Sequence, residues 1–412
     1  MRRSKTWIHN GMRRLGLLFL TVSCWTTAGY AAECDEFVSL VARAKSSYQK
    51  EHRIYPVPDA IIALARRYMP RLWVHPQSWH PISFADYLDR SRLIRISDAQ
   101  VVGFRPSIHS LSALDFADQC ATYLKSEEIK PQTPAPVYIQ VFWDQNPAIA
   151  AEKWTYIKYN LVFDWSGLAK KISWYSRLGA LMIGGDADRW HRLDVHTAAI
   201  LAFDSDQRLR LVTLAQHNHQ HTYLAGVDLP GTARPMLVAA VRSNELYLDQ
   251  GETVPVSHRV VPFFNKVAYL IDPKKKPLFW AKDITFGRHA GGKEIPLKPV
   301  FIAPGHPLAD YAGLLAPADR FLGMYTGRDG PPGYNYYAPP AYISLVNFAA
   351  MGYWQSGDRE LLQKITPFIA DLRNTDWRAI VQVMRGHLAE AILNHPVQHS
   401  RQALGPEMLP LN

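Results

Sequence analysis

Cysteine is scarce in this sequence, with three residues in 412, and the motifs of the common hydrolases are missing. There is no Gly-x-Ser-x-Gly turn for a serine nucleophile, no His-Glu-x-x-His zinc motif and no Walker loop for phosphates. No internal repeat is found either. These absences exclude the enzyme classes that depend on those motifs, and they exclude repeat folds.

Long runs of one charge are also missing, although the chain is basic, with a formal net charge of +10. Lys274-Lys275-Lys276 is the only cationic triplet, and the other basic residues are scattered along the sequence. Scattered cations do not form the continuous basic stripe that nucleic acid binding needs. We therefore expect no nucleic acid partner.

The N-terminus has the pattern of a secretory signal. Arg13-Arg14 precedes the apolar residues 15–22, and small residues lead to Gly29-Tyr30-Ala31, an acceptable cleavage site. We therefore expect residues 1–31 to be a signal peptide and the protein to be periplasmic or secreted. The alternative is an uncleaved anchor, since residues 15–32 are about long enough for a marginal membrane span. Membrane association is expected only in that case.

Cleavage after Ala31 would remove Cys24 and leave Cys34 and Cys120, an even pair in an oxidising compartment. We expect these two cysteines to form a disulfide, with two free buried thiols as the alternative. A disulfide would leave no thiol for catalysis. A hydrolase would then need a metal ion or a His–Asp acid–base pair.

Strand candidates outnumber helix candidates up to about residue 305, and helices follow. The strand candidates are rich in aromatic and β-branched side chains and span residues 137–143, 154–163, 236–241 and 257–264. Helical patterns after Pro304-Gly305 span residues 341–354, 358–372 and 375–394. The sequence thus predicts a mainly β fold with helical additions. We expect a β-sandwich-like core with N-terminal helices over residues 32–305, and a C-terminal helical region packed on it over residues 306–412.

The candidate chemistry gathers in residues 184–223, which are predicted to contain a β-hairpin. Two β-rich runs, 193–203 and 208–216, flank the polar turn at 204–207. Pairing Phe203 with Arg208 would place Asp194 opposite His217. Side-chain alternation then puts Asp194, His196, His217 and His219 on the same face of the sheet. A turn one residue longer or shorter would send them to opposite faces.

Three histidines, His217, His219 and His221, alternate along the predicted second strand and its continuation. Imidazoles at this spacing can share one ion, so Asp194, His217 and His219 are the candidate ligands of one divalent metal ion of the zinc type. His191 or Asp188 is the candidate catalytic base. The alternative is that His217 ends a strand by hydrogen bonding and residues 218–221 form only a polar loop.

Several segments follow one another in the order of a known family pattern. They are Tyr68-Met69-Pro70, Leu72-Trp73-Val74-His75-Pro76, Pro81-Ile82-Ser83, the aromatic run 156–165, Gln216-His217 and the stretch from Arg234 to Tyr247. Together they resemble the family named for a yeast vacuolar protein sorting factor of the sixty-two type, over residues 60–251. The resemblance implies that four polar residues of the family's site carry over and bind the ligand: Gln216, His217, Ser243 and Tyr247.

The departures from that pattern concern charged and imidazole groups. Arg189 and His191 stand where the family has an Asp and a Glu around its tryptophan, and Asn244 stands where it has a histidine. A more distant similarity to the necrosis-inducing cytolysins implies a β-sandwich with a divalent-cation site that engages lipid head groups. Their Gly-His-Arg-His-Asp-Trp-Glu signature is not reproduced here, so cytolysis is not implied.

The combined expectation is a periplasmic or secreted protein that binds a polar ligand, either a glycan or a lipid head group. The site is expected to be rich in histidine and to lie at one end of a β-sandwich. Two alternatives stay open at this point. One is a metal-dependent hydrolase of the cell envelope, and the other is a structural envelope protein in which the family's site is vestigial.

Overall fold

The computed structural model describes residues 47–217, 219–229, 234–260, 280–319, 328–331, 344–355 and 377–395. The expected signal peptide, Cys34 and the expected helix over 358–372 lie outside these residues. Cys120 is buried at the end of a helix, and its pairing with Cys34 stays a prediction. In the part of the chain just given, no helix is long and apolar enough to cross a membrane.

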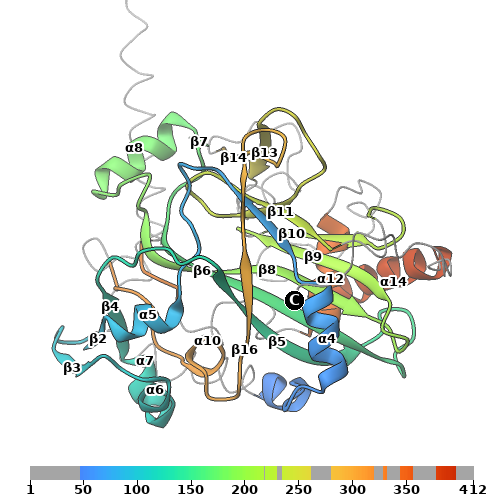
Figure 1. The fold of residues 1–412 in the computed structure, drawn as a ribbon, viewed down its shortest axis with the longest axis horizontal. Helices are drawn as coiled ribbons and strands as arrows, with labels where there is room; N and C mark the ends of the chain where they lie inside the picture. The colour runs from blue at the N-terminus through green and yellow to red at the C-terminus, as the bar shows by residue number, and fades with distance from the viewer. Residues whose placement is uncertain are drawn as a thin grey trace, which may run out of the picture.

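The fold is mainly β with helical additions, as the sequence predicts (Figure 1). The described strands are β1 (Arg71–Val74), β2 (Ser91–Arg95), β3 (Val101–Phe104), β4 (Thr122–Ser126), β5 (Ala135–Gln145), β6 (Lys153–Ser166), β7 (Lys171–Ile172), β8 (His191–Phe203), β9 (Leu209–Gln216), β10 (His219–Leu224), β11 (Met236–Ala239), β12 (Leu246–Leu248), β13 (Val256–Val260), β14 (Ala281–Thr285), β15 (Lys293–Ile295) and β16 (Leu297–Phe301). The described helices are α4 (Asp59–Arg67), α5 (Phe84–Asp89), α6 (Ile108–Ala113), α7 (Phe116–Cys120), α8 (Trp174–Met182), α10 (Pro307–Asp310), α12 (Leu345–Gln355) and α14 (Trp377–Asn394).

Two sheets enclose the main core. The larger sheet has the order β10-β9-β8-β6-β5-β16, antiparallel except for the β5–β16 pair, and the smaller has the order β12-β11-β1-β15. Leu72 and Leu237 from the smaller sheet meet Ile157 and Leu201 from the larger one in a single buried cluster. Each such side chain contributes roughly 1.5–3 kcal/mol when it is fully removed from water.

Alternation along β6 supplies a second core on the far face of the larger sheet. Trp154 and Tyr156 point away from the first core and pack with Phe348 of α12 and Leu388 of α14. The sheet is therefore covered on both faces, which explains why nearly every residue of β6 is buried. Long aromatic and β-branched runs suit such a doubly covered strand.

A third sheet, in the order β13-β14-β7, forms one end of the molecule (Figure 1). The chain leaves β7 directly into α8, which begins after Ser173, whose hydroxyl accepts a hydrogen bond from the amide of Ser176. The amide of Ser173 donates to the carbonyl of Trp280 at 2.9 Å and so ties the start of α8 to β14. These contacts place α8 beside the third sheet, at the periphery of the fold.

The predicted hairpin forms, but its register is shifted. Ile200 pairs with Thr213, and Phe203 pairs with Leu209 rather than with Arg208, so the expected pairing is wrong by two residues along most of the ladder. The reason lies in the turn, where Asp204 accepts hydrogen bonds from the amides of residues 206 and 208 and widens the loop. A shift of two residues alone would leave each side chain on its expected face. However, β8 has a bulge at Ala198, where its pairing with β6 passes from Ala199 to Thr197, so Ala198 and Ala199 both join the main core and the alternation is reversed for Asp194 and His196.

A second hairpin follows immediately, and the sequence analysis does not predict it. β9 ends at Gln216 and β10 starts at His219, where the two residues pair. The chain therefore turns back between Gln216 and His219, with His217 in the turn. The expectation that His217, His219 and His221 follow one strand is wrong, because His217 lies in the turn and the other two lie on β10.

Candidate functional site

The turn between β9 and β10 puts the imidazole of His217 at one end of the larger sheet. A two-residue hairpin loop needs a left-handed backbone at its first position, and His217 adopts it with φ 48°. Histidine tolerates this conformation better than β-branched or bulky residues do. The side chain is 28% exposed and lies close to the segment before β12 and to β14.

Asp283 on β14 is the point where three predicted polar residues converge. Its carboxylate is fully buried. One oxygen, Oδ2, accepts hydrogen bonds from Nε2 of His217 and from the hydroxyl of Tyr247, both at 2.8 Å. The other, Oδ1, accepts from the hydroxyl of Ser243 at 2.7 Å. Three of the four residues that the family pattern singles out therefore bind one carboxylate.

Glu245 extends this arrangement toward β8. Its Oε1 lies 3.0 Å from Nδ1 of His217, and its Oε2 lies 3.1 Å from Nε2 of His196. Nδ1 of His196 lies 3.8 Å from Oδ1 of Asp194. Carboxylates and imidazoles thus alternate in the order Asp194, His196, Glu245, His217 and Asp283, a set that we call the acid–imidazole chain.

The pKa shifts in this chain follow from burial and opposing charges. Burial alone would lower the pKa of His217, but the negative charge of Glu245 and the hydrogen bond to Asp283 outweigh it and raise the pKa to about 9. His196 is likewise opposed by burial, yet Glu245 and Asp194 raise its pKa well above the ordinary value. At neutral pH both imidazoles are therefore protonated on both ring nitrogens and positively charged. Together with the three carboxylates they give the acid–imidazole chain a formal charge of −1.

The acidic members respond in the opposite sense. Burial would raise the pKa of Asp283, but the hydrogen bond and charge of His217 lower it below the ordinary value. The pKa of Asp194 is also lowered, because its interaction with the nearby charged His196 outweighs burial. Each charged group in the chain thus stabilises the charged form of its neighbour, as expected of ion pairs held away from water.

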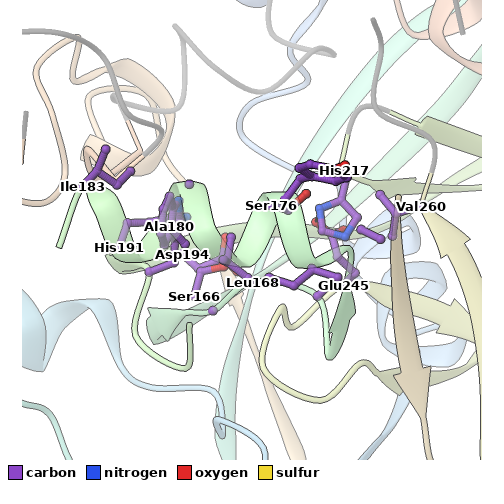
Figure 2. A pocket seen from close by; sticks show the side chains of 17 residues that line it. Ser166, Leu168, Ser176, Ala180, Ile183, His191, Asp194, His217, Glu245 and Val260 are labelled. Carbon is purple, nitrogen blue, oxygen red and sulfur yellow. Dashed lines mark ion pairs between the residues drawn. The ribbon is translucent and has the colours of Figure 1, made fainter. Parts of the chain in front are cut away.

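A pocket of about 610 Å³ lies between the acid–imidazole chain and α8. Asp194, Glu245 and His217 contribute to its polar wall, together with His191. Figure 2 shows these side chains following the length of α8, from His191 and Asp194 at one end to Glu245 and His217 at the other. The apolar lining is supplied by Leu168, Ala169, Ile172, Tyr175, Ala180, Ile183, Trp190, Val260 and Ala281.

His217 also lines a second cavity of about 390 Å³, which Tyr247, His221 and His258 share. The imidazole of His217 therefore stands between two cavities, while the carboxylates that bind it are buried or nearly so. The ring of His258 stacks on Tyr247 with 3.7 Å between centroids. Burial lowers the pKa of both His221 and His258, so these two rings are neutral at neutral pH, unlike His217.

The other predicted site residues have different positions. Gln216 donates through Nε2 to the carbonyl of Leu246 at 2.7 Å, which fastens β9 to β12. Asp188 does not line the pocket, because its carboxylate pairs with Arg242. The side chain of His219 lies outside the described part of the chain, so its role stays a prediction.

The arrangement fits an ion-pair chain better than a metal centre. Both ring nitrogens of His217 face carboxylates, and a histidine must be deprotonated to bind a metal ion. Among the residues that the structure describes, no group of three or more His, Cys, Asp and Glu side chains is arranged to hold a metal. The zinc-type ion expected at Asp194, His217 and His219 accordingly stays an untested prediction.

Two of the five members of the acid–imidazole chain escape the sequence analysis. Glu245 lies between Ser243 and Tyr247, inside a segment that the family pattern marks, but the pattern leaves its position unspecified. Asp283 is separated from His217 by 66 residues. The only local sign of a special role is that it is an acidic residue within a β-rich stretch, where aspartate is uncommon.

Asn244, which departs from the family pattern, has a defined local role. Its backbone is left-handed with φ 60°, a conformation that asparagine tolerates well. Its Nδ2 donates to the carbonyl of Trp165 at 2.7 Å and to Oδ2 of Asp194 at 3.2 Å, so it orients one end of the acid–imidazole chain.

Comparison of the protein with known proteins found no matching family model, no matching curated protein and no matching solved structure.

Proposed function

We propose that this protein binds a ligand with a polar end in the pocket between α8 and the acid–imidazole chain. The observation that carries the proposal is the convergence of Asp194, Glu245 and His217 on one wall of a pocket whose other lining is largely apolar. Ligand sites of this kind combine an apolar lining with a few fixed polar groups. Export to the periplasm or the exterior, inferred from the N-terminal sequence, is part of the same proposal.

The charge of the polar wall favours one class of ligand. Because the acid–imidazole chain has a formal charge of −1, a cationic amine or a group rich in hydroxyl donors complements it better than an anion does. Both nitrogens of His217 already face carboxylates, so the imidazole has no ring donor left for an anionic ligand. The ligand is then an amino-containing lipid head group or a glycan whose apolar part contacts α8.

General-base catalysis is less compatible with this geometry. A general base needs an unprotonated nitrogen within hydrogen-bond reach of the substrate. His217 is protonated at neutral pH, and its two nitrogens are 2.8 and 3.0 Å from carboxylate oxygens. We therefore place binding ahead of the hydrolase alternative.

Two probes that have the same length of alkyl chain and head groups of opposite charge test the proposal. In isothermal titration calorimetry below the micelle concentration, dodecylamine is expected to bind at least about tenfold more tightly than dodecanoate, a difference of about 1.4 kcal/mol. The variant Glu245→Gln removes one negative charge from the wall and is expected to reduce this preference. Equal binding of the two probes, or none, would contradict the proposed ligand class.

A space-filling substitution on α8 locates the binding. Gly179 lines the pocket, and a Cβ added there meets no atom within 4 Å, so the backbone of α8 accepts a side chain at this position and the ring of Gly179→Phe is expected to take up space in the pocket. We expect it to abolish binding of dodecylamine. Gly386 on α14 is also open around its Cβ and is exposed, so Gly386→Phe is the matched control and should bind as the parent does.

A further inference from the structure

The third sheet has two faces, and only one of them adjoins the pocket beside α8. On β14 the side chains of Ala281 and Asp283 point to that face, where Ala281 lines the pocket and Asp283 binds His217. Lys282 and Ile284 alternate with them and point to the opposite face. There Ile284 lines a separate cavity of about 260 Å³. The opposite face of this sheet therefore has surroundings of its own.

Cations gather on this opposite face. Lys171 on β7 pairs with Lys282 on β14, and Lys282 pairs with Arg259 on β13, so three cations form one row across the sheet. All three are exposed, and Lys170, which precedes β7, is half-buried in the wall of the cavity. Like charges directly opposite each other on neighbouring strands destabilise a sheet. A bound anion would offset this repulsion.

No carboxylate neutralises these charges among the residues that the structure describes. None of the four cations has an ion-pair partner there. The strands of the third sheet contain one acid, Asp283, and it is buried on the other face with His217. Glu294, on the strand beside β1, is held by Arg71 at 2.7 Å. The positive charge of this face is thus available to a ligand.

The cavity beside the cations is lined by hydrogen-bond donors. Its polar residues are Lys170, Lys171, Ser257, Gln77 and His75. Nδ1 of His75 accepts a hydrogen bond from the amide of Gln77 at 3.1 Å, so the neutral ring carries its proton on Nε2. The pKa of His75 is lowered, first by burial and second by the charge of Lys170, which keeps the ring neutral at neutral pH.

The rest of the cavity lining is apolar. Val241, Pro255 and Ile284 contribute aliphatic surface, and the ring of Phe286 lies against that of His75 with 4.1 Å between centroids. Pockets for drug-sized ligands begin at about 300 Å³, so this cavity suits a smaller molecule. Its composition matches an anionic group attached to a compact apolar body.

We propose that this cavity and the adjoining cations bind a small organic phosphate. Lysine binds phosphate as a compact point charge, and a phosphate monoester carries close to two negative charges at neutral pH. Two lysines in the wall and two further cations in the adjoining row oppose that charge. The apolar part of the lining contacts the organic part of the ester.

This site differs from the pocket beside α8 in both place and charge. The two cavities have no lining residue in common. The pocket beside α8 has a polar wall of formal charge −1 and is proposed to bind a cationic head group, whereas the second site is cationic and binds an anion. Phosphate binding therefore goes beyond the proposed function and does not depend on it.

Isothermal titration calorimetry with the full chain in phosphate-free buffer tests this site. Phenyl phosphate is expected to bind at least about tenfold more tightly than benzoate, which has the same ring and a single negative charge. Added salt should weaken the binding of phenyl phosphate, because the cations are largely exposed. Equal binding of the two probes, or no binding of phenyl phosphate, would overturn the proposal.

Substitutions of the cations locate the binding. The double variant Lys170→Gln, Lys171→Gln should bind phenyl phosphate at least about tenfold more weakly than the parent. Lys282→Gln should also weaken binding, but it should not lower the melting temperature, because it removes two like-charge contacts. Lys125 is exposed on β4, in a different sheet, so Lys125→Gln is the matched control and should bind as the parent does.

The outcomes separate this site from the pocket beside α8. Gly179→Phe should lose dodecylamine and keep phenyl phosphate, whereas the Lys170, Lys171 variant should do the reverse. Circular dichroism checks that each variant is folded. Undiminished phenyl phosphate binding by a folded Lys170, Lys171 variant would contradict the proposed site. A lower melting temperature for Lys282→Gln would also count against it, because Lys282 would then serve the fold.

Discussion

Replacing Asp283 by alanine is expected to lower the free energy of unfolding by roughly 3–5 kcal/mol. The carboxylate is fully buried and accepts three hydrogen bonds, from Ser243, Tyr247 and His217. Its removal leaves two hydroxyl groups without their acceptor and an imidazolium with one carboxylate instead of two. Unpaired buried groups of this kind carry the full desolvation penalty. Urea unfolding monitored by tryptophan fluorescence measures the loss.

Two further variants calibrate that result. Asp283→Asn keeps the shape and one acceptor oxygen but loses the charge, so its destabilisation should be smaller than that of Asp283→Ala. Asp89 is exposed, and Asp89→Ala should change the free energy of unfolding by less than about 0.5 kcal/mol. If Asp283→Ala lowers the free energy of unfolding by less than about 1 kcal/mol, Asp283 does not hold the acid–imidazole chain together.

Loss of His217 should destabilise the protein in a way that depends on pH. His217→Asn is the suitable change, because asparagine tolerates the left-handed backbone at φ 48° and preserves the hairpin turn. The pKa of His217 rises from 6.5 to about 9 on folding. A shift of that size corresponds to about 3 kcal/mol. We expect a loss of that order in the free energy of unfolding at about pH 6.

The sign of the pH dependence follows from the direction of the shift. A histidine whose pKa is raised by folding contributes fully below its unfolded pKa of 6.5, and the contribution is lost as the pH rises through about 9. The gap between parent and His217→Asn should therefore be widest at about pH 6 and should narrow toward about pH 10. Denaturant unfolding across this range measures it, and a gap that stays constant or widens would show that His217 is not protonated in the folded protein.

The sequence predicts the local part of the fold well, because local patterns encode it. Aromatic and β-branched runs identify β5 and β6, and the polar turn at 204–207 identifies the hairpin of β8 and β9. The same alternation predicts that Asp194 and His217 share one face of the hairpin. Both line one pocket, but the bulge of β8 at Ala198 and the turn at His217 bring them there, not the expected register. The register itself depends on the side chain of Asp204, which a turn pattern does not specify.

The partners of His217 could not be predicted in the same way. Asp283 reaches His217 only because β14 joins a separate sheet, and Glu245 becomes a partner only because the chain turns just before β12. Such contacts depend on tertiary topology rather than on local spacing. The second hairpin, which joins β9 to β10, was missed for a related reason. Three alternating histidines look continuous when the pairing of Gln216 with His219 is unknown.

The central claim is that His217 is an imidazolium held by Glu245 and Asp283 in the wall of the pocket. Nitrogen-15 NMR of the histidine rings at neutral pH tests it most directly, with the His217 signals assigned by their loss in His217→Asn. Our account predicts that Nδ1 and Nε2 of His217 both carry a proton and that deprotonation begins only well above neutral pH. A His217 ring with one bare nitrogen at neutral pH would contradict it.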